Sequence, residues 1–341
     1  MTTTLSVTVN EVSQVGEARR VATALGRRCG LDATTSGRLA LVVTEVGTNL
    51  VKHAGGGRIL VRALRPSADG IEVLAIDTGP GMGNVIACLR DGFSTKGSPG
   101  TGLGAVSRVA DEFEVYSLPG RGAVLLARVL ARGRPAAART FVEGVAAHAY
   151  GHGDVSGDGW AIQPAPDRLR VLVADGLGHG PDAAAAAHAA VSAFESDGSG
   201  GPAAAVERLH AALRHTRGAA VAVAEVRPRA GVVAFCGVGN ISAALTTEAG
   251  MRSLASYNGT AGVEARKIAE FTYPWTEGAV LIVHTDGVSG RWSLEGYPGL
   301  AARHPGLIAG VLLRDFGRDS DDATVVAVRP AGPAARGEER R

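Results

Sequence analysis

The sequence has few cysteines, few aromatic residues and almost no net charge, and each shortage excludes a class of protein. Its three cysteines lie far apart and form no CxxC pair, which argues against a disulfide framework or a zinc finger and predicts a reducing, cytoplasmic location. Aromatic residues make up 4% of the chain and the formal net charge is +2, so no nucleic-acid-binding surface is indicated.

Long hydrophobic runs are also missing. Every apolar run is shorter than the roughly 20 residues that a membrane-spanning helix needs. The N-terminal residues lack the basic and apolar regions of a signal peptide. We therefore expect no membrane segment.

What the chain does have is the length and composition of two globular domains. It holds 341 residues, of which 45% are apolar, and a domain typically contains about 100 to 200 residues. The segment ARGRPAAAR lacks an apolar period and lies between strand-like runs. We predict a first domain at 1–130, a linker at 131–139, a second domain at 140–330 and a disordered polar tail at 331–341.

Hydrophobic periodicity predicts an α+β fold for both domains. In the first, we expect helices on one face of a mixed sheet, with helices near 15–29, 35–54 and 103–110 and strands near 58–64, 71–77, 112–117 and 123–130. In the second, we expect two sheets with helices outside, the strands near 141–149, 169–174, 219–226, 232–236, 280–284 and 323–328 and the helices near 182–194, 203–215 and 300–313.

Two motifs in the first domain point to nucleotide chemistry. Glu45 and Asn49 are four residues apart, so a carboxylate and an amide project from one helix face and could hold a divalent ion and position a hydroxyl nucleophile. A solvated helix face is the alternative. Asp77, Gly79 and Gly81 follow a strand, where glycines let the backbone approach a flat ligand, although a tight turn has the same composition.

A third motif, GSPGTGLG at residues 97–104, leads into a predicted helix. The free N–H groups and positive dipole end of a helix N-terminus suit phosphates. No GK[ST] follows, so the loop is not a Walker A motif, and its late position in the domain argues against a dinucleotide-binding turn.

In this order, E-x-x-x-N, D-x-G-x-G and G-T-G-L-G resemble the GHKL ATPase superfamily, and GFSTKGSPGTGLGAVSRVADEF is most similar to the anti-sigma-type switch kinases of bacterial stress signalling. The resemblance implies a GHKL-type α/β sandwich that holds ATP and Mg²⁺ beneath a lid. Glu45 would orient or deprotonate the attacking hydroxyl, Asn49 would ligate Mg²⁺, and Asp77 would bind adenine beside Gly79 and Gly81. The lid would contain Lys96, and the residues around the phosphates would be Gly100, Thr101, Gly102, Leu103 and Gly104.

In the second domain, acidic residues recur beside small residues at predicted strand ends, at Asp158, Asp175, Asp286 and the pair Asp321 and Asp322. Carboxylates with small neighbours suit Mg²⁺ or Mn²⁺, and two such ions could activate a water and clamp a phosphate. A single Asp-Gly is more often a turn, but four such sites in one domain favour a metal centre.

The segments SGDGW, ADGLGHG, GVGNIS, HTDGVSG and SDDATVVAV occur in the order of the SpoIIE-like branch of the metal-dependent, type 2C phosphatases, which this domain resembles. The resemblance implies an α-β-β-α sandwich and attack of a metal-activated water on phosphoserine or phosphothreonine. Asp322 is an alternative to Asp321 as a ligand, and the implied ligands of two Mn²⁺ or Mg²⁺ ions are Asp158, Asp175, the Gly176 carbonyl, Asp286 and Asp321.

Other catalytic groups are weaker candidates. A cysteine phosphatase with a C-x5-R loop is excluded, since the positions that would need arginine hold Thr35, Ser94 and Ser242. His179 is either a contact for substrate phosphate or an exposed loop residue. A transition-metal site and an ordinary strand-end loop are both open for the group His148, His152 and Asp154.

Together, the two resemblances predict a bifunctional protein-serine kinase and phosphatase that acts on STAS-domain regulators in a bacterial partner-switching pathway. We expect no nucleic-acid or membrane partner, and a homodimer is left open. The alternative is an ATP-binding module that sequesters a regulator without phosphorylating it, beside an active phosphatase. A histidine kinase is disfavoured because no phosphoacceptor histidine precedes His53 in a dimerisation helix.

Overall fold

The computed structural model describes residues 4–64, 69–89, 102–131, 140–151, 155–196, 198–247, 249–318 and 320–331. The chain forms two compact units, residues 2–137 and 138–341. Among the described residues, no helix is at once long enough and apolar enough to cross a bilayer. The linker and tail that the sequence predicts fall largely outside the described ranges, and they stay predictions.

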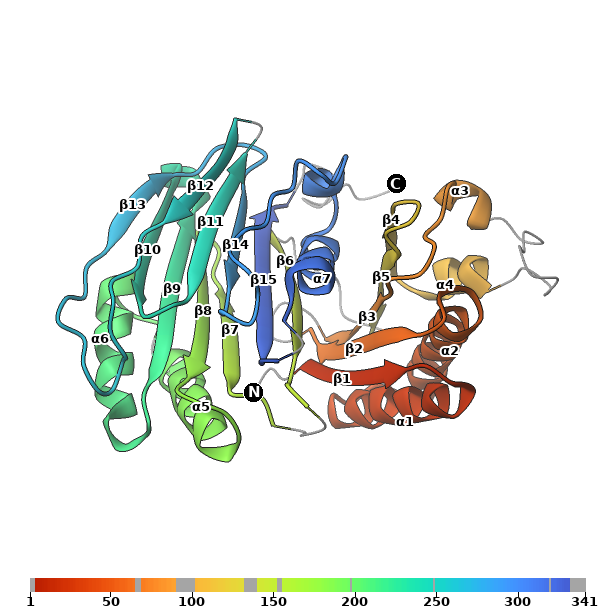
Figure 1. Cartoon of the computed structure of the whole chain (residues 1–341), viewed down its shortest axis with the longest axis horizontal. Helices are drawn as coiled ribbons and strands as arrows, with labels where there is room; N and C mark the ends of the chain where they lie inside the picture. The colour runs from red at the N-terminus through yellow and green to blue at the C-terminus, as the bar shows by residue number, and fades with distance from the viewer. Residues whose placement is uncertain are drawn as a thin grey trace. The chain divides into compact units, whose positions relative to one another are not determined.

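The first unit is a five-stranded sheet in the order β1-β2-β3-β5-β4, with helices packed on one face (Figure 1). Every pair of neighbouring strands is antiparallel, so the expectation of a mixed sheet is wrong. Its elements are β1 (Thr4–Val9), α1 (Val12–Arg28), α2 (Ala33–Asn49), β2 (Gly57–Ala63), β3 (Gly70–Ile76), α3 (Val85–Cys88), α4 (Gly102–Val109), β4 (Glu112–Ser117) and β5 (Ala123–Leu130).

The apolar stripe of α2 determines which face of the helix packs against the sheet. Asp32 caps its N-terminus by accepting a hydrogen bond from the Thr35 N–H at 2.7 Å. Leu39, Val42 and Val46 are buried in the core that α2 shares with the sheet. Because residues that are three and four apart share a helix face, this burial leaves the Glu45 and Asn49 line half-buried at the edge of the core.

The end of this helix differs from the prediction of one α-helix to residue 54. The α-helical pattern stops at Asn49, and Leu50–Ala54 continue as a π-helical turn that Gly55 ends with φ of 79°. Single π turns occur often at functional sites.

The second unit contains two five-stranded sheets, β13-β10-β9-β8-β7 and β12-β11-β14-β15-β6. Its helices are α5 (Pro181–Ser196), α6 (Pro202–Ala212) and α7 (Pro305–Phe316). Its strands are β6 (Phe141–His148), β7 (Asp158–Pro164), β8 (Leu169–Gly176), β9 (Ala219–Arg227), β10 (Val232–Val238), β11 (Ser242–Thr247), β12 (Gly250–Leu254), β13 (Phe271–Pro274), β14 (Val280–His284) and β15 (Ala323–Pro330).

The layers of this unit form an α-β-β-α sandwich. One core lies between the two sheets and contains side chains such as Val171, Phe235 and Leu281. A second core joins α5 and α6 to the outer face of the β8–β9–β10 sheet (Figure 1). On the other side, α7 packs on β6 and β15, where a Cβ at Gly144 would lie 1.9 Å from the Gly306 nitrogen. The helix therefore starts in direct backbone contact with the sheet.

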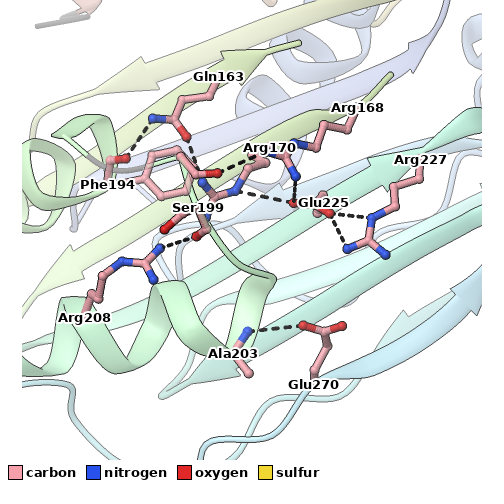
Figure 2. Close-up of polar contacts among 11 residues, drawn as sticks. Gln163, Arg168, Arg170, Phe194, Ser199, Ala203, Arg208, Glu225, Arg227 and Glu270 are labelled. Atoms are coloured by element: carbon pink, nitrogen blue, oxygen red, sulfur yellow. Dashed lines mark hydrogen bonds and ion pairs between the residues drawn. The ribbon is translucent and has the colours of Figure 1, made fainter. Parts of the chain in front are cut away.

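A buried polar network fixes the end of α5 to the sheet (Figure 2). Arg170 on β8 lies over the Phe194 ring, with its guanidinium carbon 5.0 Å from the ring centroid, and its Nη1 donates to Gln163 Oε1 at 3.2 Å. Gln163 Nε2 in turn donates to the Phe194 carbonyl at 2.8 Å. The buried carboxylate of Glu225 lies between this arginine and Arg227, whose Nη2 is 2.5 Å away. The N-terminal end of the same helix faces the opposite end of β8.

Candidate functional site

Glu45 and Asn49 lie together with the start of α4 in the first unit. A Cβ built on Gly102 would stand 3.1 Å from Glu45 Oε2 and 3.3 Å from Asn49 Oδ1. The N-terminus of α4 therefore lies directly over the polar edge of α2. Within the described part of the chain, the buried Asn49 Nδ2 has no hydrogen-bond partner.

The far end of α4 is attached to the same helix. Arg38 donates from Nε and Nη2 to the Val109 carbonyl, at 3.1 and 2.7 Å, and Nη2 lies 2.8 Å from Asp111 Oδ2. A cation at a helix C-terminus satisfies free carbonyl groups and stabilises the helix dipole. Helix α2 thus holds α4 at both ends, and sequence reasoning missed Arg38 because it belongs to no motif.

Asp77 follows β3, and its carboxylate is oriented by the backbone around it. Its Oδ1 accepts hydrogen bonds from the Gly79 N–H at 2.9 Å and the Ala123 N–H at 3.2 Å. These two bonds fix the turn to the start of β5. They fix the direction of the second carboxylate oxygen as well.

The glycines of this turn are required by backbone contacts within the protein. A Cβ on Gly79 would lie 2.6 Å from Ala54 Cα, in the π-helical turn. Gly81 has φ of +70°, and a Cβ there would lie 2.1 Å from the Leu118 carbonyl oxygen. These contacts give the glycines a packing role in addition to the ligand contact that the resemblance implies.

Of the other residues that are predicted to bind the nucleotide, some fall within the described ranges and some do not. Gly104 is buried, and Leu103 packs against the hydrophobic core of the first unit. Lys96, Gly100 and Thr101 lie outside the described residues.

In the second unit, the predicted acidic residues come from the ends of strands in both sheets. Asp158 at the start of β7 is the cross-strand partner of Asp175 at the end of β8. Asp286 follows β14, and Asp321 and Asp322 precede β15, which pairs with β14. The two sheets thus bring these carboxylates to one end of the sandwich.

Three of these carboxylates, those of Asp175, Asp286 and Asp321, line one open cavity of about 600 Å³. The wall also contains Asn240, which donates from Nδ2 to Asp286 Oδ2 at 2.7 Å. His179 is exposed and lines the same cavity, so its position is compatible with both alternatives considered for it.

The two neighbouring aspartates at 321 and 322 face different surroundings. Asp322 accepts hydrogen bonds from the Tyr150 and Gly157 N–H groups, each at 2.6 Å, and is 8% exposed. Asp321 lines the cavity and accepts from the Asp322 N–H at 2.9 Å. The geometry therefore favours Asp321 over Asp322 as the cavity-facing carboxylate.

Asp158 is not among the residues that line the cavity, but it is the cross-strand partner of Asp175, which is. Thr285 Oγ1 donates to its Oδ2 at 2.8 Å, while its buried Oδ1 has no hydrogen-bond partner within the described ranges. A buried carboxylate oxygen without a donor is costly unless a cation or a proton is bound to it. Because Thr285 donates to the other oxygen of this carboxylate, Thr285 is a functional candidate that sequence reasoning did not name. The sequence signal for it is its position in the HTDG segment.

Burial and neighbouring carboxylates raise the pKa of three aspartates in the cluster. Burial raises the pKa of Asp158 well above its usual range, and the neighbouring charge of Asp175 raises it further. Burial, followed by the charges of Asp286, Asp321 and Asp322, raises the pKa of Asp175 to about 7. Burial and Asp286 also raise the pKa of Asp321. Such mutual repulsion is relieved by protons or by cations.

The ligand atoms that the acidic cluster offers are chemically suited to a pair of hard divalent cations. The cluster offers carboxylate oxygens and one orphaned buried oxygen, which are ligands that Mg²⁺ and Mn²⁺ prefer. Within the described ranges, no three His, Cys, Asp or Glu side chains already stand in a closed ligand arrangement. The carboxylates would therefore have to move closer around a cation, or reach it through water, as Mg²⁺ commonly allows.

Gly176 ends β8 beside Asp175 and cannot be any other residue here. Its N–H donates to the Gly157 carbonyl at 2.9 Å, and a Cβ would lie 2.0 Å from the Ala183 carbonyl oxygen in α5. Of the other histidine group, His148 is buried at the end of β6, and His152 and Asp154 lie outside the described residues.

Comparison with known families divides the chain in the same way. Residues 8–128 match the model of the histidine kinase-like ATPase domain, and residues 165–330 match that of stage II sporulation protein E, SpoIIE. The chain is 31% identical over 106 residues to the serine/threonine-protein kinase RsbT of Bacillus subtilis (strain 168), a match that spans 31% of this chain and 80% of RsbT.

Solved structures similar to this chain include one described as "The bacterial stressosome: a modular system that has been adapted to control secondary messenger signaling". It is 27% identical with a TM-score of 0.52, and the match covers 56% of this chain and 100% of that one. A structure of RsbX in complex with magnesium is 21% identical with a TM-score of 0.48, over 56% of this chain and 96% of that one.

Proposed function

Because the chain belongs to the histidine kinase-like ATPases through its RsbT-like first domain and joins to it a SpoIIE phosphatase domain of the PP2C type, we propose that it is a bifunctional regulator of protein phosphorylation. The first domain would phosphorylate a serine of a partner protein, and the second would remove phosphate from the same or a related partner. The proposed partners are STAS-domain regulators of a bacterial partner-switching pathway.

In the kinase half, phosphoryl transfer requires positioning and charge neutralisation more than covalent chemistry. When bound, ATP with Mg²⁺ would supply the phosphoryl group and part of that neutralisation. Asn49 is the side chain that would hold the cation. Glu45, beside the start of α4, would accept the proton of the serine hydroxyl as the serine oxygen bonds to the γ-phosphorus and the bond from that phosphorus to the ADP oxygen breaks. Asp77, fixed by two backbone amides, would receive the adenine amino group.

In the phosphatase half, two divalent cations would supply Lewis acidity and an activated water. The residues that would hold them are Asp175, Asp286 and Asp321, which line the cavity, and Asp158, the cross-strand partner of Asp175. In the overall hydrolysis the water oxygen would bond to phosphorus, the bond from phosphorus to the serine oxygen would break, and a proton of the water would end on the serine oxygen. His179 and Asn240 line the space that the phosphate would occupy.

The observation that carries the proposal is the convergence of Asp175, Asp286 and Asp321, from three strand ends of two sheets, on one cavity, with Asp158 paired across the strands to Asp175. Burying several carboxylates close together destabilises the folded domain when no cation is present. Bound cations would remove this cost by neutralising the carboxylates. In the first domain the corresponding observation is the meeting of Glu45 and Asn49 with Gly102, which lies far from them in the sequence.

The test uses the full chain, purified STAS-domain proteins and labelled ATP, first with Mg²⁺ and then with Mn²⁺ added. We expect label to move to a serine of one STAS protein and then to be released as phosphate. Glu45→Gln should lower transfer by at least about 100-fold with ATP binding kept, whereas Glu17→Gln, at an exposed position of α1, should change neither.

The two halves can fail separately in this experiment. ATP binding without transfer to any partner would reduce the first domain to a sequestering module. Release of phosphate that is insensitive to chelation of divalent cations would contradict the assignment of the second domain.

A further inference from the structure

Beneath the acidic cavity lies a chain of buried hydrogen bonds that the proposed reaction does not use. Trp292 donates from Nε1 to His284 Nε2 at 2.9 Å, and His284 Nδ1 lies 2.8 Å from the Thr285 carbonyl oxygen. Because Nε2 accepts a proton donor, the neutral imidazole carries its hydrogen on Nδ1 and donates it to that carbonyl. The Thr285 carbonyl, and with it the backbone before Asp286, is therefore fixed by residues that do not belong to the acidic cluster.

The Thr285 side chain continues this chain into the cluster. Its hydroxyl accepts a hydrogen bond from the Thr324 N–H at 3.0 Å and donates its one hydrogen to Asp158 Oδ2 at 2.8 Å. Thr285 is fully buried, with 0% exposure, so solvent does not compete for either bond. One hydroxyl thus joins the ends of β14 and β15 in one sheet to the start of β7 in the other.

Asp158 needs such a restraint because of where it lies. Its cross-strand partner is Asp175, so two carboxylates face each other across neighbouring strands, and like charges opposite each other are destabilising. Thr285 donates a hydrogen bond to Asp158 Oδ2, the Thr324 side chain also lowers the pKa of Asp158, and within the described residues Oδ1 is left for another ligand.

We propose that Thr285 is a positioning residue that holds the Asp158 carboxylate ready for a cation, and that Trp292 and His284 hold Thr285. The inference rests on the proposed metal-dependent phosphatase function and extends it to residues outside the ligand set. Partners that orient ligands in this way commonly change metal affinity by about 10- to 100-fold when they are removed.

The test compares four variants of the full chain by Mn²⁺ titration calorimetry and by the metal dependence of p-nitrophenyl phosphate hydrolysis. Thr285→Val keeps the shape and removes the hydroxyl, and we expect about a 10- to 100-fold loss of Mn²⁺ affinity. Thr285→Ser restores the hydroxyl and should stay within about threefold of the wild type. Trp292→Phe removes only the N–H donor and should cost about three- to tenfold.

Thr246→Val is the matched control. Thr246 is also a buried threonine on a strand of the same unit, and its hydroxyl has no hydrogen-bond partner within the described ranges. Its replacement should leave Mn²⁺ affinity unchanged. Circular dichroism shows whether each variant is folded, and Trp292→Phe gives an independent answer if Thr285→Val does not fold.

Wild-type Mn²⁺ affinity in folded Thr285→Val, or equal losses in Thr285→Val and Thr285→Ser, would overturn the inference. If the wild type binds Mn²⁺ but hydrolyses no phosphoester, the proposed function fails while the calorimetric comparison still decides the role of Thr285. If the wild type binds no Mn²⁺ at all, both are wrong.

Discussion

The two candidate sites are built in opposite ways. In the first domain, one helix carries Glu45 and Asn49 and also holds α4 at both ends, so the site depends on close approach of uncharged backbone to a few side chains. In the second domain, strand ends from two sheets gather carboxylates that repel one another. The first site should therefore be sensitive to added volume, and the second to the balance of charge.

The largest effect is expected from neutralising one member of the acidic cluster. Asp175→Asn should lower phosphatase activity by more than about 100-fold, because a cation ligand is lost. The same change should raise the stability of the metal-free domain, since it removes charge repulsion among buried carboxylates. Phosphate release and thermal unfolding in a chelator measure the two effects.

The control for this variant is Asp182→Asn, in the first turn of α5. Asp182 is ion-paired with Arg217 and both side chains are more than half exposed, so neither activity nor stability should change much. A metal-free Asp175→Asn protein that melts below the wild type would show that repulsion does not dominate the cluster.

Added volume in the first domain should have the next largest effect. Gly81→Ala places a methyl group at a positive φ and 2.1 Å from the Leu118 carbonyl oxygen. We expect a loss of about 2 to 4 kcal/mol in the free energy of unfolding of this domain. Gly83→Ala is the matched control, because no atom lies within 4 Å of the added methyl group. Equal urea midpoints for the two variants would contradict the volume argument.

The acidic cluster should also make stability depend on pH. Folding raises the pKa of Asp175 to about 7, so between about pH 4 and pH 7 the folded state binds more protons than the unfolded state. Stability of the metal-free second domain should therefore fall as pH rises through this window, by at most about 1.4 kcal/mol per pH unit for one carboxyl. Urea unfolding in a chelator should show this slope in the wild type and a smaller slope in Asp175→Asn.

The smallest effect is expected from weakening the attachment of α4 to α2. Arg38→Met removes two hydrogen bonds to the Val109 carbonyl and the ion pair with Asp111. We expect a loss of about 1 kcal/mol in stability and about fivefold weaker ATP binding, measured by calorimetry. Arg38→Lys keeps the charge without the two-point contact and should lie between Arg38→Met and the wild type. Unchanged ATP affinity in Arg38→Met would mean that α4 is positioned by other contacts.

Much of the fold was predictable from apolar periodicity, and the exceptions have physical causes. The strands β4, β5 and β14 begin and end where the sequence predicts, because each is a short run of apolar or β-branched residues between turn residues. Strands β1, β7, β11, β12 and β13 were missed. Strands β12 and β13 are only five and four residues long, β1 and β11 are rich in threonine, serine or alanine, and β7 begins inside the glycine-containing segment SGDGW. Pairing direction is a long-range property, and so the mixed sheet was predicted wrongly.

The candidate sites were predictable only as far as residue type signals chemistry. Asp158, Asp175, Asp286 and Asp321 stand out because an aspartate next to a small residue at a strand end is a recognisable pattern. Thr285 and Arg38 act through hydrogen bonds to groups that are 127 and 71 residues away in the sequence. A local sequence pattern cannot identify partners at such distances. The choice between Asp321 and Asp322 likewise depended on which carboxylate the backbone amides of a distant loop occupy.

The π-helical turn at Leu50–Ala54 has a consequence for how the first domain tolerates changes in length. Such a turn amounts to an α-helix with one inserted residue. Deleting Val51 should let the segment relax into regular α-helix, with Glu45 and Asn49 on one side and Ala54, against Gly79, on the other kept in register. The first domain should therefore tolerate a single-residue deletion within this turn better than one in the middle of α2, which would rotate Glu45 relative to Asn49.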